Sequence, residues 1–381
     1  MQTLSKAGSF TLLAVACLTI MVGCVIVPGL PTIARQLGVA HASSWLVTVP
    51  SLGVIVFGAF AGKLIQRSGS YTALCLGLFS YGLLGGAGFM LHGALAVFTD
   101  RLMLGGATAL IMAAGTGLIS EFYEGKARLS MIASQGMAIE LGGVVFLFIG
   151  GVLANAGWQC PFALYLTAWG FLALVLLFVP RLGGHHQRDT VGQGQTRIST
   201  AIKVVFALAL LSMLVFFTAV IMLPLRLHAL NLDEAQVGYF LSFTSLVAVG
   251  AAALMPSSAS RFGEHGTQVI AFLFYALAHL VFSTADGLML MIGGAVCLGI
   301  GFGLSVPLVN HMTIEHSEQH QRGCNLAYLS MAIFAGQFLS SFMEFMPGSQ
   351  LRVFGCACII ALGVALVLLF AHKNRWIQRN G

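Results

Sequence analysis

Long, continuous apolar runs separated by short polar stretches set the class of fold for this chain. Of its 381 residues, 58% are hydrophobic and only 8% are charged, whereas a water-soluble domain carries about 25% charged residues. A helix needs about 20 apolar residues to cross the hydrocarbon core of a bilayer. The runs are continuous rather than alternating, so helices are expected and not the strands of a barrel. The sequence therefore predicts an all-α membrane protein.

Twelve apolar segments of spanning length fall into two groups of six. The long polar interval from Arg181 to Thr200 is rich in Gly, Gln and charged residues, as flexible linkers are. The sequence predicts an N-terminal six-helix half at 1–181, a cytoplasmic linker at 182–200 and a C-terminal six-helix half at 201–381. The predicted spans are about 9–34, 44–66, 71–92, 94–119, 129–154, 158–180, 202–227, 235–257, 267–285, 287–312, 323–346 and 350–372.

The basic residues gather on one side of the predicted membrane. Of the 18 Lys and Arg residues, 14 lie at the termini or in alternate loops, and the other four are Arg35, Arg101, Arg226 and Arg352. Because short cytoplasmic loops collect Lys and Arg, both termini are predicted to lie in the cytoplasm of a multi-pass protein, with a bacterial inner membrane as the expected location. The same distribution accounts for the net charge of +6 without a nucleic-acid partner.

The two halves align with an almost constant offset. Arg67 and Arg261 lie 194 positions apart. Three further pairs share that offset, namely Glu121 with Glu315, Arg128 with Arg322 and Gly142 with Gly336. Since each half has an even number of spans, both halves enter the membrane from the same side. The sequence thus predicts a parallel repeat about an axis along the membrane normal.

A glycine-framed basic stretch, GKLIQRSG, lies between the second and third predicted spans. Its residues include Gly62, Lys63, Gln66, Arg67 and Gly69, and the second half repeats the core as Arg261 and Gly263. The stretch resembles the Gly-x-Leu-x-Asp-Arg-x-Gly signature of the major facilitator superfamily, with Gln66 in place of the acidic residue. The segments 28–34, 101–107 and 157–162 are similar to other motifs of that family, so the resemblance covers essentially the whole chain.

The resemblance implies two six-helix halves that rock around a central site, and it gives this loop a role in switching between states. The glycines permit a tight turn and close helix approach. Lys63 and Arg67 are expected to meet carbonyl groups at helix C-termini. In the family the acidic residue pairs with a group on another helix and so holds one conformation. The uncharged Gln66 is therefore expected to hold that conformation less firmly. The alternative is that the basic residues only set the topology.

One carboxylate, Glu140, is predicted near the middle of the membrane, whereas the other acids fall in loops or near span ends. It lies 11 residues after Leu129, about 16 Å along a helix, which is half the hydrocarbon thickness. An ionisable residue at that depth is costly and by default functional. A dry site disfavours the charged carboxylate, which suits reversible protonation. The alternative is a structural, hydrogen-bonded Glu.

Arg101, in the outer third of the fourth predicted span, is the second costly residue. It is either a charge partner for a proton site or an anionic substrate, or a tie to helix carbonyl groups. Asp100 is expected to point away from it, since adjacent positions diverge on a helix. The depth of Arg101 differs from that of Glu140 by about 10 Å, so no direct pair is assumed. A structural role is favoured for His279.

Four polar or aromatic residues are candidates for the substrate cavity, although amides also join helices. They are Gln135, Trp169, Gln337 and Asn310. The eight cysteines are scattered and give neither a disulfide framework nor metal-ligand spacing. No metal and no cofactor are therefore expected.

The resemblance implies a secondary active transporter that works by alternating access. The shape of the chain is similar to the drug-efflux branch, which favours proton-coupled export of a small amphipathic compound or metabolite. Uptake by proton symport stays open, because the sequence does not fix the direction. A channel is disfavoured because the sequence has no filter repeat, and a membrane enzyme because it has no nucleotide-binding loop. The expected partners are protons, a small-molecule substrate and the lipid bilayer, and the chain is expected to act as a monomer.

Overall fold

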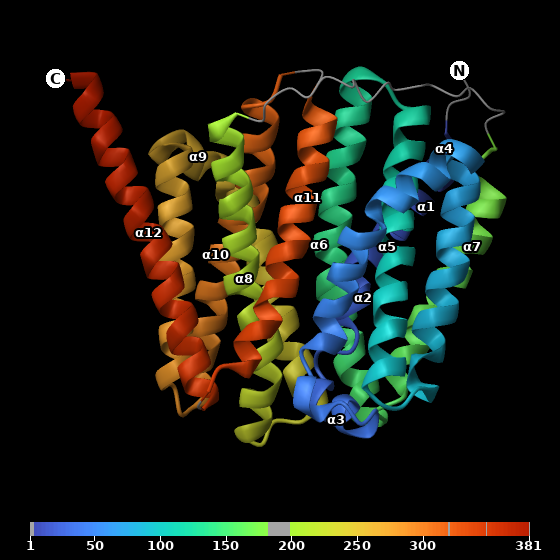
Figure 1. Cartoon of the computed structure of the whole chain (residues 1–381), viewed down its shortest axis with the longest axis horizontal. Helices are drawn as coiled ribbons and strands as arrows, with labels where there is room; N and C mark the ends of the chain where they lie inside the picture. The colour runs from blue at the N-terminus through green and yellow to red at the C-terminus, as the bar shows by residue number, and fades with distance from the viewer. Residues whose placement is uncertain (1–3, 182–198, 319–320, 348, 381) are drawn as a thin grey trace. The chain divides into compact units, whose positions relative to one another are not determined.

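The computed structural model describes residues 4–181, 199–318, 321–347 and 349–380, with the backbone alone described at Leu129 and at 371–380. These residues are nearly all helical, and no strand occurs among them (Figure 1). In this part of the chain, 10 helices are long and apolar enough to cross a membrane. The prediction of an all-α membrane protein is confirmed.

The described residues contain twelve α-helices and four short 3-10 helices. The α-helices are α1 (Lys6–Ala16), α2 (Leu18–Cys24), α3 (Leu30–Gln36), α4 (Trp45–Ala87), α5 (Ala94–Phe122), α6 (Gly125–Ala156), α7 (Thr167–Phe178), α8 (Thr200–Ala229), α9 (Glu234–Thr284), α10 (Leu288–Glu315), α11 (Arg322–Leu339) and α12 (Gln350–Asn380). The short 3-10 helices are η1 (Ala40–Ala42), η2 (Gly88–Met90), η3 (Cys160–Leu166) and η4 (Ser340–Phe345).

The described residues form two compact units. The first contains the described residues up to 181 together with 233–242, which are the first turns of α9. The second contains 199–232 and the described residues from 243 onward. Most of the predicted linker, at 182–198, lies outside the described residues. The predicted halves at 1–181 and 201–381 stay a prediction.

Two helices are too long to be single spans, and each is divided by a kink. A straight α-helix of the length of α4, 43 residues, would reach about 65 Å, roughly twice the hydrocarbon thickness. Its backbone is non-helical at Gly69, where φ is 79°, and Figure 1 shows α4 as two arms. In α9, 51 residues long, Gly263 has φ 73°. Glycine adopts this left-handed region without a steric penalty, so both kinks need it.

The first predicted span, 9–34, is interrupted rather than continuous. Lys6–Cys24 forms one candidate span of 19 residues, from α1 and α2. Residues 25–29 then leave the helix before α3 begins at Leu30 with a proline in its first turn. Proline has no N–H to give and favours the start of a helix, and Pro28 and Pro31 flank this interruption. The break leaves irregular backbone directly after Cys24.

Local side-chain caps fix three helix starts. The Ser5 hydroxyl accepts a hydrogen bond from the Gly8 amide at 3.0 Å, at the start of α1. Ser199 caps α8 by accepting from Ile202. At the start of α9, the Gln236 amide donates to Asp233 Oδ1 at 2.8 Å, and the Asp233 amide donates to Gln236 Oε1 at 3.0 Å. This reciprocal pair is a capping box, which satisfies two otherwise orphaned donors.

Candidate functional site

Glu140 lies in α6, inside a candidate span, and is partly buried. Within the described part of the chain its carboxylate forms neither a hydrogen bond nor an ion pair. Its electrostatic neighbour is the Cys24 thiol, at the last residue of α2. No cation therefore offsets a charge on Glu140 among these residues.

The glycine face of α6 holds this carboxylate close to the first span. A Cβ atom placed on Gly142 would lie 2.9 Å from the Cys17 Cβ, and one on Gly150 would collide with the Val25 carbonyl oxygen. The Cys17 thiol donates to the Ala138 carbonyl at 3.0 Å. Small residues at such positions let helix backbones approach closely in a membrane, so the glycines of α6 position Glu140 beside the interrupted part of the first span.

The same stretch of α6 also packs against the first turns of α9. A Cβ atom on Gly151 would lie 2.7 Å from the Gly238 Cα, and the Ser242 hydroxyl donates to the Val144 carbonyl at 2.8 Å. Phe148 and Tyr239 stack with ring centroids 5.0 Å apart. These contacts lie one to three turns beyond Glu140 along the helix, over the same stretch of α6 that contacts the first span.

Arg101 is enclosed in the first unit, with 1% of its surface exposed. Its Nη1 donates to the Tyr165 hydroxyl at 3.2 Å, and its Nε lies 3.9 Å from Asp100 Oδ2. The guanidinium stands over the Phe162 ring at 5.2 Å. The expectation that Asp100 points away is wrong, because the long arginine side chain folds back toward it. The sequence rule describes where Cβ atoms point and not where a guanidinium ends.

The partners of Arg101 connect it to the first span and not to Glu140. The Tyr165 hydroxyl, which accepts from Arg101, donates to the Val22 carbonyl at 2.8 Å. Val22 belongs to α2, the helix that ends at Cys24. Arg101 thus joins α5, η3 and α2, and its arrangement is that of a buried tie between helices.

The basic loop of the first unit is exposed, and its contacts differ from those expected. Lys63, Gln66 and Arg67 form no hydrogen bond or ion pair with any described residue, so the expected bonds to helix carbonyl groups do not occur. Nothing lies within 4 Å of a Cβ atom on Gly62, so close helix approach is not needed there. The side chains extend into open space instead.

The tie that does occur at this kink comes from the residue that follows Gly69. The Ser70 hydroxyl donates to Glu121 Oε1 at 2.5 Å, joining the kink of α4 to the end of α5. This pair was not predicted from the sequence, although Glu121 and Glu315 lie at equal distances along the chain from the two kink glycines.

The corresponding kink in the second unit carries a different set of groups. Arg261 is exposed and stands 5.4 Å from the Phe262 ring centroid. Glu264, which follows Gly263, lies 3.0 Å from His316 Nε2 and 3.9 Å from His311 Nε2. These histidines belong to the end of α10 and were not predicted as site residues.

The four predicted cavity residues are distributed over both units, and three of them have local partners. Gln135 and the Thr116 hydroxyl lie 3.3 Å apart, and the Trp169 indole donates to the Phe79 carbonyl at 3.1 Å. Asn310 donates to the Val306 carbonyl one turn earlier in α10. Gln337 is buried in α11. Three of the four thus join or brace helices.

His279 has the setting of a structural residue. It is fully buried, its Nε2 lies 3.0 Å from the Val215 carbonyl oxygen, and its ring contacts those of Phe282 and Phe354.

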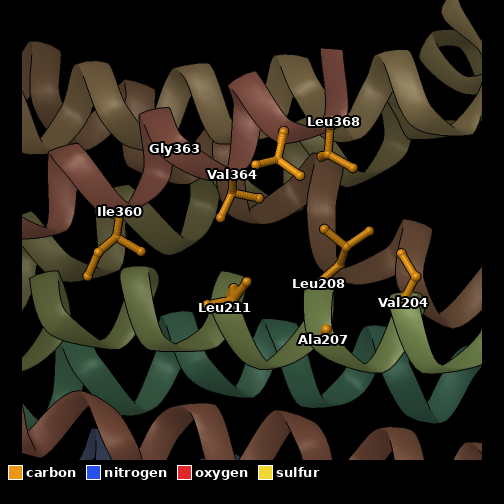
Figure 2. A pocket seen from close by; sticks show the side chains of 9 residues that line it. Val204, Ala207, Leu208, Leu211, Ile360, Gly363, Val364 and Leu368 are labelled. Carbon is orange, nitrogen blue, oxygen red and sulfur yellow. The ribbon is translucent and has the colours of Figure 1, made fainter. Parts of the chain in front are cut away.

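The second unit also contains an apolar cavity. A cavity of about 390 Å³ lies between α8 and α12 and is lined by side chains such as Val204, Leu211 and Ile360 (Figure 2). Its lining includes none of the predicted cavity residues.

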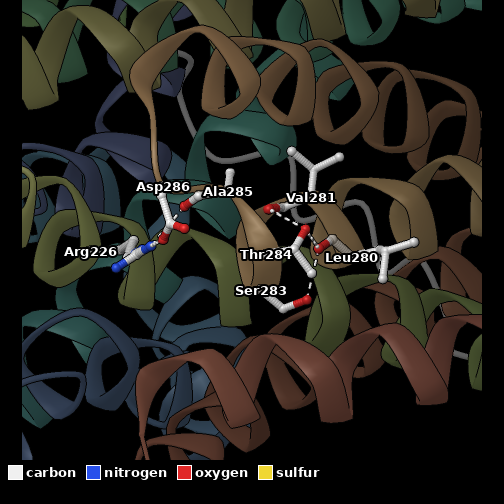
Figure 3. A network of polar contacts seen from close by, with 7 residues as sticks. All are labelled: Arg226, Leu280, Val281, Ser283, Thr284, Ala285 and Asp286. Atoms are coloured by element: carbon white, nitrogen blue, oxygen red, sulfur yellow. Dashed lines mark hydrogen bonds and ion pairs between the residues drawn. The ribbon is translucent and has the colours of Figure 1, made fainter.

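A polar contact lies at the other end of α8. Arg226 Nη2 donates to the Ala285 carbonyl at 2.7 Å and pairs with Asp286 at 3.4 Å, beyond the end of α9 (Figure 3).

Comparisons with known proteins were made against families, curated sequences and solved structures. The family model of the Major Facilitator Superfamily matches residues 11–341. A search of curated proteins found no match. Among solved structures, a mutant of the peptide transporter POT in complex with sulfate is 14% identical with a TM-score of 0.73, covering 96% of this chain and 94% of that one.

Two further solved structures resemble the chain. A mutant of the nucleoside transporter NupG is 14% identical, with a TM-score of 0.73 and coverage of 96% of this chain and 99% of that one. The xylose transporter XylE from E. coli, in an inward-open conformation, is 16% identical with a TM-score of 0.71 and 96% coverage of each chain. At these identities the likeness concerns the fold alone.

Proposed function

The chain belongs to the major facilitator superfamily and is a secondary transporter rather than an enzyme, and from this premise we propose that it exports a small amphipathic compound or metabolite in exchange for protons. The family implies two halves that expose a central site to each side of the membrane in turn. Export is proposed on the resemblance of the chain to the drug-efflux branch. Proton symport into the cell is the competing direction, and the experiment below separates the two.

The observation that carries the proposal is the unpaired carboxylate of Glu140 in a membrane span. A permanently charged group would need a cation or several donors to offset its lost hydration, and Glu140 has neither among the described residues. A neutral carboxyl is stable when dry and loses its proton when water reaches it. Alternating hydration from the two sides would then carry one proton per cycle.

The surroundings of Glu140 support such alternation. Cys24 is its neighbour, and the irregular backbone of residues 25–29 follows directly. Glycines on α6 keep the first span close, so a small shift between the two changes the access of water to the carboxylate. We assign Arg101 a supporting role in coupling, since it holds α2 through Tyr165 and Val22.

The kinked loops at Gly69 and Gly263 are proposed as the switching elements, together with Gly62 and the exposed Lys63, Gln66, Arg67 and Arg261 beside them. We further propose that each arm of α4 and α9 crosses the membrane separately, which gives twelve spans. Both termini and the linker then face the cytoplasm, and the protein acts as a monomer in a bacterial inner membrane. Gln135, Trp169, Gln337 and Asn310 remain candidates for contact with substrate.

The decisive experiment is transport by the purified protein in proteoliposomes under an imposed pH gradient, with a panel of radiolabelled amphipathic compounds and metabolites as probes. Export by antiport predicts that a compound moves against the proton flux. Glu140→Gln retains the shape and the hydrogen-bonding capacity of the side chain but cannot release a proton. We expect it to lose gradient-driven accumulation and to retain exchange of labelled for unlabelled compound.

Glu124→Gln is the matched control, because it removes the same charge from an exposed position at the start of the same helix. It should transport like the wild type. Movement of compound together with protons would replace export by uptake. Full gradient-driven accumulation by the Glu140 variant would refute the role of this carboxylate in either direction.

A further inference from the structure

The kink of the second unit contains a carboxylate held between two histidines. Glu264 directly follows Gly263, and 24% of its side chain is exposed. Its Oε2 lies 3.0 Å from His316 Nε2, and its Oε1 lies 3.9 Å from His311 Nε2. His311 is in the last turns of α10 and His316 caps that helix. One carboxylate therefore joins the kink of α9 to the end of α10.

The first unit builds the same joint without an imidazole group. Ser70 and Glu264 each follow the kink glycine and lie 194 positions apart. Ser70 donates to Glu121 at the end of α5. The joint between Ser70 and Glu121 thus contains no histidine, the residue type that serves as a pH-dependent switch near neutrality.

The joint of the second unit contains two histidines beside the carboxylate. Histidine is the residue type that serves as a pH-dependent switch in the physiological range. When His316 is neutral, one N–H···O contact to Glu264 is available. When it is protonated the contact becomes a charge-assisted hydrogen bond, which is shorter and stronger. Protonated His311 adds a second cation on the other carboxylate oxygen.

The other charged or titratable groups at this end of α9, α10 and α11 do not take the place of the two histidines as partners of Glu264. The described partners of Glu264 are the two histidines. Arg261 stands over the Phe262 ring, and Glu315 is exposed in the last turn of α10. The other such groups are His265, Glu318, Arg322 and Cys324.

We propose that Glu264, His311 and His316 form a pH-sensitive clamp that tightens the second kink when the surrounding solution is acidic. Acidification closes the contact between the kink of α9 and the end of α10, and alkalinisation loosens it. In the proposed topology this solution is the cytoplasm. The clamp makes the conformational cycle depend on pH independently of the proton carried at Glu140.

The expected size of the effect is modest because both histidines are partly exposed, with 53% and 36% of their side chains accessible. Partly exposed ion pairs change an equilibrium by about two- to five-fold. This change acts on the ratio of closed to open kink conformations.

The test uses the full-length protein in lipid nanodiscs, with spin labels on genetically encoded amino acids at Ser260 and Gly323, so that the native cysteines stay in place. Both positions are exposed and uncharged, and a side chain at Gly323 would meet no atom within 4 Å. The Asn325 amide donates to Ser317 at 2.8 Å, so this label follows the end of α10. Pulsed electron resonance gives the distance distribution at about pH 8 and about pH 5.5, on either side of neutrality.

We expect the short-distance population to rise about two- to five-fold on acidification. Glu264→Gln should abolish this response, His316→Gln should weaken it because His311 still faces the carboxylate, and Glu121→Gln, at the joint of the first unit, should leave it unchanged. A wild-type distribution that does not depend on pH, or a pH response that survives in Glu264→Gln, would overturn the proposal. Should Glu264→Gln or His316→Gln fail to fold, the other decides the question.

Discussion

Two tyrosines occupy corresponding places in the two units but have different partners. Tyr81 and Tyr275 are each fully buried and each lie 12 residues after the kink glycine. Tyr81 donates to the Leu18 carbonyl at 2.8 Å. Tyr275 lies 3.0 Å from the Ser212 hydroxyl and 2.9 Å from that of Ser305. The tyrosine hydroxyl at this position is thus hydrogen-bonded to the backbone in one unit and to side chains in the other.

The difference extends to the surrounding residues. Ser212 and Ser305 correspond, at the 194-residue offset, to Leu18 and Ile111. Arg101 corresponds to Ala295, which is fully buried. The repeat therefore preserves backbone positions, kinks and one tyrosine, while the buried polar groups have diverged. The first unit thus contains a buried guanidinium, and the second contains three mutually hydrogen-bonded hydroxyl groups.

Removing the guanidinium should have the largest effect on stability. Arg101→Ala leaves Asp100 without its partner inside the protein and removes the contacts to Tyr165 and Phe162. Breaking a buried ion pair from one side costs about 3–5 kcal/mol. We expect a large fall in the thermal unfolding temperature of the detergent-solubilised protein. Arg101→Lys should recover part of it, and a stability unchanged by Arg101→Ala would show that the guanidinium is not a tie.

A smaller effect on stability is expected from substitutions at Gly142 and Gly336, which occupy corresponding positions in the two units. A Cβ atom on Gly336 would collide with the Leu210 carbonyl oxygen, whereas one on Gly142 would meet the Cys17 side chain at 2.9 Å. Backbone yields less readily than a side chain, so Gly336→Ala should cost about 2–3 kcal/mol and Gly142→Ala about 1. Thermal unfolding of the two variants side by side checks the order, and the reverse order would contradict it.

The tyrosines themselves should give the smallest effect. Tyr81→Phe removes the donor to Leu18, which costs about 1 kcal/mol. Tyr275→Phe leaves Ser212 and Ser305 bonded to each other at 2.7 Å, so about half that cost is expected. Denaturation of both variants under one set of conditions gives the difference. Equal losses of stability in the two variants would mean that the Ser212–Ser305 hydrogen bond does not compensate for the missing Tyr275 hydroxyl.

The fold class was predictable because a protein that is solvated by lipid has a distinctive amino-acid composition. Runs of apolar residues and the asymmetry of Lys and Arg need no tertiary information. The kinks at Gly69 and Gly263 were visible as glycines in matching loops. The interruption of the first span was not predicted, because Pro28 and Pro31 were read as parts of a longer span rather than as its boundary.

The contacts of the candidate site were less predictable, because they depend on where long side chains end. Arg101 folds back on Asp100 although adjacent positions diverge, and Lys63 and Arg67 bind no carbonyl group among the residues that the structure describes. Ser70, His311 and His316 were not predicted as site residues, since hydroxyl and imidazole groups near loops are common. Their partners are Glu121 and Glu264, beside the two kinks. Glu140 stays a prediction, which rests on its depth in the membrane.

The most direct test of the account follows proton movement itself. Proteoliposomes are loaded with a pH-sensitive dye, no gradient is imposed, and a transported compound is added outside. The account predicts a substrate-dependent pH change inside for the wild type and for Glu124→Gln, and none for Glu140→Gln, although the latter still exchanges the compound. A substrate-driven proton flux of wild-type size in Glu140→Gln would contradict the claim that this carboxylate couples protons to transport.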